Sequence, residues 1–592
     1  MVCMGEKESR QMCNLISAVV VFSLVCLCMY GIMGVYSFSL FPDEFGYWAC
    51  AAKLLGYDFS EVASIGSYYS FGYSLILTPI FLIFQDSIIC YRAAVVVNLF
   101  LQILSYFIMS EILDRFAKEL RKPVRLILAG VYVLYPSWVF YTQMTMSEAL
   151  LFFLYTLIVY LVILYLEKPT ILRGILLAVC SVYIYTVHMR TVGVLLSVFL
   201  MVLAELVIYK ERNRKSAAIT LIILVAGFLA AFGAKDVFQS FVFNSGPVDS
   251  TYINDYSGQT GKFAEILLPK GFAKFFVSMS GKILYLGCAT FGSALIGVRF
   301  LINRKNEHDR AAIFILTASA LEFLIMCIYL LHSADTNATR FDLFLHGRYF
   351  DFAIPLLAVI GIFGLIRTNS FLVKLLFSNC ELLLCSVIAI FVCAYNRTGM
   401  NDPHGTLMIG MSYFLDEENV QPMKVIILSV LFAIGGSFLL AYVIYLFREK
   451  HNIYALICIP VCFMALGYQA CNHFIYISQS YAYGDVQVAD KISELRTSGY
   501  DGDIVMLYEG GLEYIDTVQF RLRDEHIKVY YPGKELSEHS EAITRYLEDV
   551  PEDAIVLVDF ESGLNEFARN VYDKSWESGH FNIYYNCLEG DT

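Results

Sequence analysis

Charged residues are scarce in this chain. Asp, Glu, Lys and Arg make up only 16% of its 592 residues, and 58% are hydrophobic. Soluble proteins carry roughly a quarter charged residues, so this shortage excludes most soluble classes. With a mean hydropathy of +0.61 and many long apolar runs, the sequence predicts a polytopic α-helical membrane protein.

Signatures of several other functions are missing as well. No basic patch interleaved with aromatic residues indicates binding to nucleic acid. Most of the sixteen cysteines lie inside apolar runs, where they act as small hydrophobic residues. Cys458 and Cys462 are four residues apart, but they lack the His or second Cys pair of a zinc site. Lys7 and Arg10 precede the first apolar run, and no small-residue cleavage site follows, which predicts an uncleaved first span.

The apolar runs predict about thirteen membrane spans. They fall near residues 14–36, 88–112, 126–141, 147–166, 174–189, 191–209, 216–234, 283–301, 311–332, 352–366, 371–394, 425–447 and 453–472. If Met1 is cytoplasmic, the connections on the inner side, such as 113–125 and 210–215, are all basic, as the positive-inside rule requires. The odd number of spans then places the C-terminus outside.

The first outer connection, residues 37–87, is unusually long. It contains the apolar segment Phe71–Phe84, which is short for a span and includes Pro79. A run of about 14 residues is more often interfacial or re-entrant than spanning. We therefore expect this segment to lie at the outer surface, and long ordered loops are commonly functional.

The tail, residues 473–592, differs from the rest of the chain. It holds 24 Asp and Glu against 9 Lys and Arg, so its net charge is more negative than the net charge of -12 of the whole chain. Its sequence predicts a small water-soluble α/β domain, because strand-like and helical patterns alternate. The expected strands are Ile504–Tyr508, Ile527–Tyr531, Ala554–Phe560 and Phe581–Tyr585, and the expected helices are 485–498, 537–549 and 563–574. We expect a membrane domain over 1–472 and an extracytoplasmic domain over 473–592, which serves as a cap or an acceptor-docking module.

Two adjacent acids follow the first span. Asp43 and Glu44 lie beside Tyr47 and Trp48, and such aromatic residues favour the headgroup region of a membrane. Partial removal from water and a neighbouring like charge raise the pKa of a carboxyl group, as a general base requires. The alternative interpretation is a solvated pair of acids.

Glu148 begins a predicted helix at the same outer face, with Ser147 before it. An acid in the first helical turn can satisfy free backbone amides and the helix dipole. The residue therefore has either this structural role or a role in a site.

Two arginines interrupt apolar sequence at that face. Arg190 lies where the fifth predicted span meets the sixth, and it either snorkels to the interface or binds an anionic headgroup. Arg348, flanked by His346 and Tyr349, could form two hydrogen bonds to a phosphate. Asp351 could instead neutralise Arg348 structurally. Carboxylates and arginines on one face suit a reaction on a negatively charged lipid.

These motifs, in this order, resemble the GT-C superfamily of integral-membrane glycosyltransferases. The resemblance is to the branch that holds protein O-mannosyltransferases and the aminoarabinose transferase of lipid A. It covers about residues 14–472. The matching features are Asp43-Glu44, the segment Phe71–Phe84, Tyr135-Pro136 leading to Ser147-Glu148, Arg190 followed by Thr-Val-Gly, Gly347-Arg-Tyr-Phe leading to Pro355, and a soluble outer tail.

The resemblance implies transfer of a sugar from a polyprenyl-phosphate donor to a cell-envelope glycan, lipid or protein, with inversion. Asp43 resembles the catalytic acid of the first loop, with Glu44 as its neighbour and Glu148 as the acid of the second loop. Substrate-binding positions, for the lipid phosphate or the sugar, would be Arg190, Arg348, His346, Tyr349 and Tyr47.

The resemblance leaves the metal and the setting open. Some members use a divalent cation such as Mg²⁺ or Mn²⁺, which Asp43, Glu44 and Glu148 would hold, but the first loop has no Asp-x-Asp. No Trp-Trp-Asp-Tyr-Gly sequence occurs, which argues against an oligosaccharyltransferase catalytic subunit. We expect a bacterial plasma membrane as the location.

Two other functions compete with transfer. A transporter or flippase for a lipid-linked sugar would have charges through the bilayer, whereas the middles of these spans are nearly free of them. A polysaccharide polymerase or ligase tends to use Arg and His in a large outer loop. The outer loop expected over 235–282 has neither, although it carries Lys235, Lys262, Lys270, Lys274 and Lys282.

Overall fold

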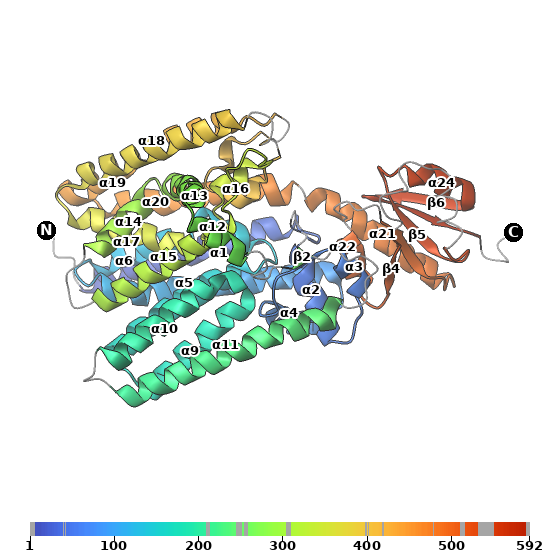
Figure 1. The fold of residues 1–592 in the computed structure, drawn as a ribbon, viewed down its shortest axis with the longest axis horizontal. Coiled ribbons are helices and arrows are strands. Elements are labelled where there is room, and N and C mark those ends of the chain that lie inside the picture. The colour runs from blue at the N-terminus through green and yellow to red at the C-terminus, as the bar shows by residue number, and fades with distance from the viewer. Residues whose placement is uncertain are drawn as a thin grey trace.

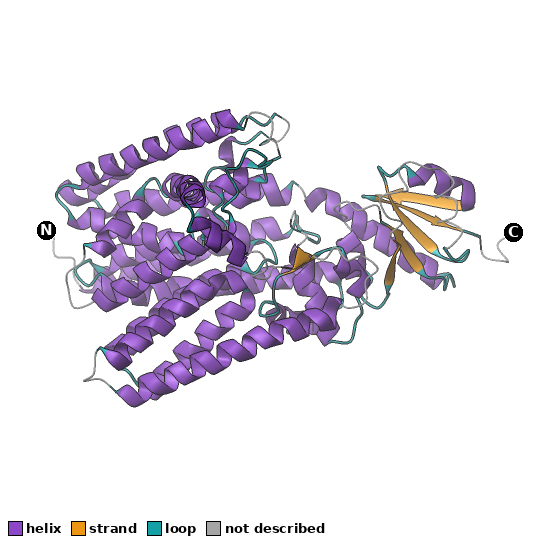
Figure 2. Cartoon of the chain, in the orientation of Figure 1, coloured by secondary structure: helices purple, strands orange, loops and turns teal. Residues whose placement is uncertain are grey.

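The computed structural model describes most of the chain. The described residues are 6–38, 41, 43–208, 213–243, 252–253, 259–303, 309–396, 400, 402–416, 419–477, 479–508, 515–530 and 550–587. Figure 1 shows a bundle of helices with the tail at one end of its long axis. Figure 2 shows that the larger sheet is confined to that end.

Every predicted apolar run coincides with a helix or a bent pair of helices. The straight helices are α1 (Glu6–Ile32), α5 (Ser87–Phe116), α8 (Glu148–Glu167), α9 (Ile171–Val187), α10 (Val192–Val207), α11 (Arg214–Phe243), α15 (Asp309–Tyr329), α17 (Ile354–Arg367), α18 (Phe371–Tyr395), α19 (Pro422–Glu449) and α20 (Cys458–Cys471). The bent pairs are α6 (Lys122–Val133) with α7 (Pro136–Thr142), and α13 (Pro269–Ala289) with α14 (Ser293–Ile302). The chain is a multi-pass membrane protein.

The number of spans is lower than thirteen when length and composition are applied strictly. Within the described ranges, nine helices are long and apolar enough to cross a membrane, or up to eleven if each bent pair is one span. Helices α9 and α17 account for the difference between eleven and thirteen spans, because they have only 17 and 14 residues. Five of the helices carry proline in the first turn (α6, α7, α13, α17 and α19), where its missing N–H costs no hydrogen bond.

The first outer connection folds into short elements between the bundle and the tail. They are α2 (Asp43–Leu54), α3 (Ser60–Ser64), β1 (Ser67–Tyr68) and α4 (Ser74–Ile83). Helix α4 lies inside the predicted segment Phe71–Phe84, contains Pro79 and has ten residues, too few to cross a bilayer. Strand β1 pairs in parallel with β2 (Tyr252–Ile253), which joins this loop to a distant part of the chain.

The loop expected over 235–282 is largely helical, which corrects that expectation. Helix α11 continues to Phe243, and α12 (Gln259–Ile266) and α13 follow. Lys235 and Lys282 are therefore helical residues, and both are buried.

The tail forms a five-stranded sheet with order β4-β3-β5-β7-β6. The strands are β3 (Ile504–Leu507), β4 (Ile527–Tyr530), β5 (Ile555–Asp559), β6 (Lys574–Ser578) and β7 (Phe581–Tyr585), and the helices are α21 (Gln479–Thr497), α22 (Ile515–Arg521) and α24 (Leu564–Val571). Strands β4, β3 and β5 are parallel, whereas β7 runs antiparallel to both of its neighbours, β5 and β6. The four predicted strands are present, β6 and α22 were not expected, and the helix predicted over 537–549 lies outside the described residues.

Two short helices of the bundle, α14 and α17, touch through glycine. A Cβ on Gly361 would lie 1.8 Å from the carbonyl oxygen of Ser293, and one on Gly297 would lie 2.0 Å from that of Leu357. Real side chains do not tolerate such distances, so the glycines set the separation of the two helices.

We predict that Gly361→Val destabilises the protein, because the side chain must push α14 and α17 apart. Overpacking costs about 1–3 kcal/mol in well-packed cores, and a backbone clash belongs at the upper end. The matched control is Gly435→Val in α19, where a Cβ meets nothing within 4 Å. Thermal unfolding of the purified variants in detergent should show a lower Tm for Gly361→Val only; equal Tm values would refute the packing argument.

Candidate functional site

Arg348 is the centre of a buried charge cluster. Its Nη2 donates to Oδ2 of Asp43 at 2.8 Å, and its Nε donates to Oε1 of Glu148 at 2.6 Å. Asp43 is the first residue of α2, Glu148 is the first residue of α8, and Arg348 lies in the turn between α16 (Phe341–Leu345) and α17. Three segments that are far apart in the chain thus meet at one guanidinium group.

The three charged side chains are almost completely removed from solvent. Asp43 and Arg348 are each 6% exposed and Glu148 is 2% exposed. Burial alone would lower the pKa of Arg348, but Glu148 and Asp43 raise that pKa well above its ordinary value. The guanidinium group therefore stays charged, and the carboxylates compensate it as a buried charge requires.

Arg190 is the second cation of the cluster. It lies in η1 (Met189–Thr191), the 3-10 turn between α9 and α10, and its Nη2 donates to the same Oε1 of Glu148 at 3.0 Å. The side chain is 3% exposed, so it does not snorkel to solvent. Its guanidinium carbon lies 4.9 Å from the ring centre of Tyr349. Within the described residues, its buried Nε and Nη1 have no hydrogen-bond partner.

Glu44 takes part in a different set of contacts from Asp43. Its Oε2 accepts hydrogen bonds from the Tyr91 hydroxyl at 2.6 Å, the Thr145 amide at 2.7 Å and the Thr145 hydroxyl at 2.6 Å. Asp43 instead accepts from the Tyr69 hydroxyl at 3.0 Å and from Arg348. Glu44 thereby ties α2 to the α7–α8 loop, while Asp43 belongs to the arginine cluster.

Tyr47, His346 and Tyr349 line the same region. The Tyr47 hydroxyl donates to Oγ of Ser147 at 2.9 Å, next to Glu148. The rings of His346 and Tyr349 lie 4.3 Å apart. Burial, together with the nearby charge of Arg348, lowers the pKa of His346 well below its ordinary value, so His346 is neutral at pH 7. Its buried Nδ1 has no hydrogen-bond partner within the described residues.

Asp351 is turned away from Arg348. Its Oδ1 accepts from the hydroxyls of Tyr285 at 2.9 Å and Tyr135 at 3.3 Å, and burial raises its pKa to about 6. Of the two interpretations of Arg348, neutralisation by Asp351 is therefore not the arrangement that the structure shows. The cation pairs with Asp43 and Glu148 instead.

Glycine allows the Arg348 turn to adopt its position. A Cβ on Gly347 would lie 1.9 Å from the Tyr285 ring, so only glycine fits there. The amides of Gly347 and Arg348 both donate to the carbonyl of Leu407, at 3.0 and 3.3 Å. These contacts fix the backbone from which the guanidinium group extends.

Sequence reasoning missed two polar residues at this site. Tyr69 carries a hydroxyl to Asp43, but no pattern in the first loop marked it. Lys235 is 6% exposed, and its Nζ lies 3.0 Å from Sδ of Met189, one residue before Arg190. Its position near the end of an apolar helix was the available signal.

The acids do not form a metal site in this arrangement. Arg348 lies between Asp43 and Glu148, and Glu44 faces Tyr91 and Thr145. No group of three or more His, Cys, Asp or Glu placed to hold a metal ion occurs within the part of the chain that the structure describes. The residues present therefore do not fit a bound divalent cation.

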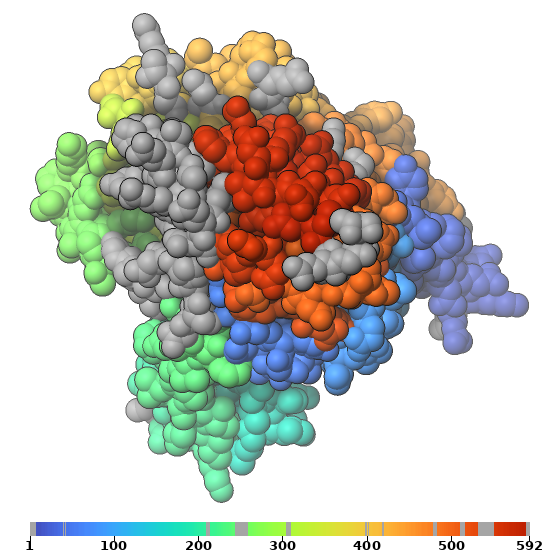
Figure 3. Space-filling view, turned by 90° about the vertical axis from the view of Figure 1, so that its right-hand side faces the viewer, coloured from blue at the N-terminus to red at the C-terminus, as the bar shows by residue number. Residues whose placement is uncertain are grey.

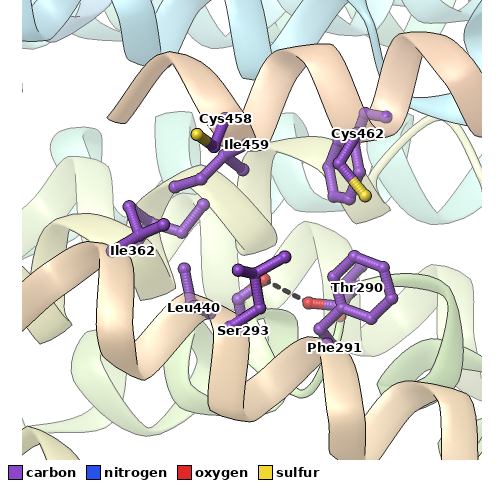
Figure 4. Close-up of a pocket in the computed structure, with 12 residues that line it drawn as sticks. Thr290, Phe291, Ser293, Ile362, Leu440, Cys458, Ile459 and Cys462 are labelled. Atoms are coloured by element: carbon purple, nitrogen blue, oxygen red, sulfur yellow. Dashed lines mark hydrogen bonds between the residues drawn. The ribbon is translucent and has the colours of Figure 1, made fainter. Parts of the chain in front are cut away.

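Cys458 and Cys462 lie apart from the charge cluster. Figure 4 shows them beside Ile362, Leu440 and Phe291, in a small pocket between α14, α17, α19 and α20. The pocket has an interior volume of about 20 Å³, about that of one water molecule. The described residues that line it include no histidine or carboxylate, so the two thiols have no partner for metal binding.

The fold of this chain also occurs in solved structures. The chain is similar to ArnT from Cupriavidus metallidurans bound to undecaprenyl phosphate, with 11% identity, a TM-score of 0.54, and coverage of 97% of this chain and 98% of ArnT. Apo ArnT gives 13% identity, 96% and 97% coverage and a TM-score of 0.49. An Archaeoglobus fulgidus oligosaccharyltransferase gives 10% identity, 94% and 70% coverage and a TM-score of 0.40.

The likeness to the undecaprenyl-phosphate-bound ArnT structure confirms the predicted fold, a polytopic helical bundle with a small C-terminal α/β domain. No protein-family model matches the chain, and no curated protein matches it in sequence.

We predict that Arg348→Met destabilises the protein strongly, because it leaves two buried carboxylates without their shared counter-charge. Breaking a buried pair in this way costs about 3–5 kcal/mol. The control, Arg367→Met, removes an ion pair with Glu119 whose side chains are 40% and 42% exposed, and such surface pairs contribute about 0–1 kcal/mol. Thermal unfolding in detergent measures both; a Tm of Arg348→Met equal to that of Arg367→Met would show that the cluster does not stabilise the fold.

Proposed function

We propose that the chain is a glycosyltransferase that moves a sugar from a polyprenyl-phosphate donor to a cell-envelope glycan, lipid or protein, with inversion. Two findings support this proposal. The fold is shared with ArnT, which has been crystallised with undecaprenyl phosphate, and a buried cluster of two arginines and two acids occupies one end of the bundle.

The proposal rests mainly on the unused hydrogen-bond donors of Arg190. A buried guanidinium group normally uses its donors, but the Nε and Nη1 of Arg190 are buried without a described partner. A phosphate offers acceptors in the geometry that this fork matches. With Arg348 alongside, the cluster suits a phosphate group that gains negative charge during the reaction.

The proposed reaction uses Asp43 as the general base. The acceptor hydroxyl oxygen forms a bond to the anomeric carbon while the bond from that carbon to the phosphate oxygen breaks. The hydroxyl proton goes to the carboxylate of Asp43, and the electron pair of the broken bond stays on the phosphate. Arg190 and Arg348 hold the phosphate as its negative charge increases.

The ion pair of Asp43 with Arg348 couples donor binding to this step. A phosphate that accepts hydrogen bonds from Arg348 competes with the carboxylate of Asp43, which is then free to accept a proton. Glu148 keeps both arginines in place through its shared Oε1. Tyr47, His346 and Tyr349 supply neutral contacts to the sugar or the phosphate, and Glu44 holds α2 in position.

We place the reaction at the outer face of a bacterial plasma membrane. The basic inner connections support a cytoplasmic N-terminus, and the tail then lies on the same side as the charge cluster. The proposal divides the chain into a catalytic membrane domain, residues 1–472, and an extracytoplasmic domain, residues 473–592.

We predict that Asp43→Asn abolishes sugar transfer, because the amide cannot accept the proton. Loss of a general base costs roughly 10²–10⁴-fold in rate. The assay is single-turnover release of sugar by purified protein in nanodiscs from a panel of polyprenyl-phosphate sugars. Asp501→Asn, at an exposed position of the tail, is the matched control and should transfer at the wild-type rate.

Unchanged turnover in Asp43→Asn would refute the assigned role. A different result would refute the enzyme class itself: no donor is consumed, but a labelled lipid-linked sugar changes leaflet in proteoliposomes. The protein would then be a transporter, and the acidic pair would belong to its binding site or gate.

We further predict that Arg190→Gln weakens binding of undecaprenyl phosphate by roughly tenfold to hundredfold, because a hydrogen bond to a charged group contributes about 1.5–3 kcal/mol. The measurement is inhibition of transfer by added undecaprenyl phosphate. Arg367→Gln, which changes a half-exposed arginine, should leave the inhibition constant unchanged. If both variants bind the lipid as tightly as the wild type, Arg190 does not contact the phosphate.

A further inference from the structure

The tail contacts the short helices of the first outer loop, one of which, α2, begins with Asp43 and Glu44. Figure 1 shows α22 beside α2 and α3, and Figure 3, viewed from the tail end, shows the orange and red tail directly on the blue first loop. Helix α22 contacts α3, and strand β4 contacts α3 as well. The tail therefore rests on the loop that presents Asp43 rather than on the bundle alone.

Phe520 is the apolar centre of this contact. Its side chain is 1% exposed, and its ring centre lies 4.8 Å from that of Trp48, 5.0 Å from Phe38 and 5.6 Å from Phe81. Burial of this ring removes a large apolar surface from water, which stabilises the contact. The tail thus inserts one aromatic ring between three aromatic side chains of the first loop.

Charged and polar groups surround this ring. Arg523 lies 3.8 Å above the Phe81 ring, and its Nη1 donates to Oε1 of Gln85 at 2.7 Å. Arg521 forms an ion pair with Asp86 at 2.5 Å. A desolvated aromatic centre with a polar rim is the usual anatomy of a specific interface.

Glu61 of α3 closes the other side of the contact. Its Oε2 accepts from the backbone amide of Val529 in β4 at 2.6 Å, and its Oε1 lies 3.0 Å from Nε2 of His526. The edge strand of the tail sheet is therefore attached to the first loop through its backbone as well as through side chains.

The contact leads directly to the charge cluster. Trp48 packs on Phe520 with its ring, and its Nε1 donates to Oγ1 of Thr145 at 3.0 Å. Thr145 in turn binds Glu44, the neighbour of Asp43, and lies three residues before Glu148. One indole therefore links the tail to α2 and to the α7–α8 loop.

We infer that Phe520 and Arg523 of the tail are positioning residues that hold α2 so that Asp43 faces Arg348. Phe520 acts directly through Trp48 of α2, and Arg523 acts through Phe81 of α4, which packs against α2. The tail is then part of the catalytic architecture, in addition to any role toward the acceptor. The catalytic consequence rests on the proposed function, whereas the hold on α2 is a physical property that can be measured by itself.

The experiment measures the position of α2 and turnover separately. In a Trp138→Phe, Trp576→Phe background, Trp48 is the remaining tryptophan, and its emission and its quenching by acrylamide report whether Phe520 covers it. Phe520→Ala should shift the emission to longer wavelength and increase quenching. Arg523→Gln is the milder variant and should give a smaller shift, and Phe520→Tyr should restore the wild-type emission.

We expect kcat to fall in the variants whose Trp48 emission shifts. A displacement of about 1 Å at a catalytic group costs on the order of 100-fold in rate, so we expect Phe520→Ala to lower kcat about tenfold to hundredfold with the donor KM unchanged. Phe560→Ala, which removes a half-exposed tail aromatic, is the control and should match the wild type in both measurements.

The outcomes separate the two proposals. Wild-type Trp48 emission in Phe520→Ala and Arg523→Gln would overturn the inference, as would shifted emission with wild-type kcat. If the wild-type protein transfers no sugar from any donor, the proposed function fails, and the emission of the variants alone decides whether the tail holds α2.

Discussion

The structure depends on one shared guanidinium group. Arg348 binds a carboxylate from the start of α2 and another from the start of α8, and all three side chains are buried. A buried charge is tolerated only when its partner is placed with accurate geometry. The turn before α17, the entry to α8 and the first outer loop must therefore form together, and each constrains the other two.

The cluster is electrically balanced in the absence of a substrate. Arg190 and Arg348 supply two positive charges, and Asp43 and Glu148 supply two negative charges. The donors of Arg190 are nevertheless not all used. In the proposed function, an anionic donor entering here would meet these free hydrogen-bond donors, and it would replace a carboxylate partner of Arg348 with its own oxygens. Binding specificity then comes from geometry more than from net charge.

The sequence predicts the apolar helices, the four tail strands and the four charged residues that meet in the buried cluster, Asp43, Glu148, Arg190 and Arg348. It does so because apolar runs, alternating patterns and isolated charges in apolar surroundings are local signals. It does not reveal that the neighbours Asp43 and Glu44 bind different partners, since successive side chains on a helix point in different directions. Tyr69 was not found, because an isolated hydroxyl has no distinctive pattern, and Lys235 was placed in an outer loop and not at the site. Strand β6 and helix α22 have only five and seven residues, too few for a clear local pattern, and their tertiary contacts define them.

The contact between the tail and the first loop also determines when, during synthesis, the site can reach its final structure. Arg521 and Asp86 are 435 residues apart in the chain, so ribosomes finish every apolar helix before the partner of the first loop is made. Until then, Phe38, Trp48 and Phe81 have no ring from the tail to cover them. Because the tail is synthesised last, this contact has to follow synthesis of the whole bundle. Truncation late in the chain therefore affects the earliest-made part of the site.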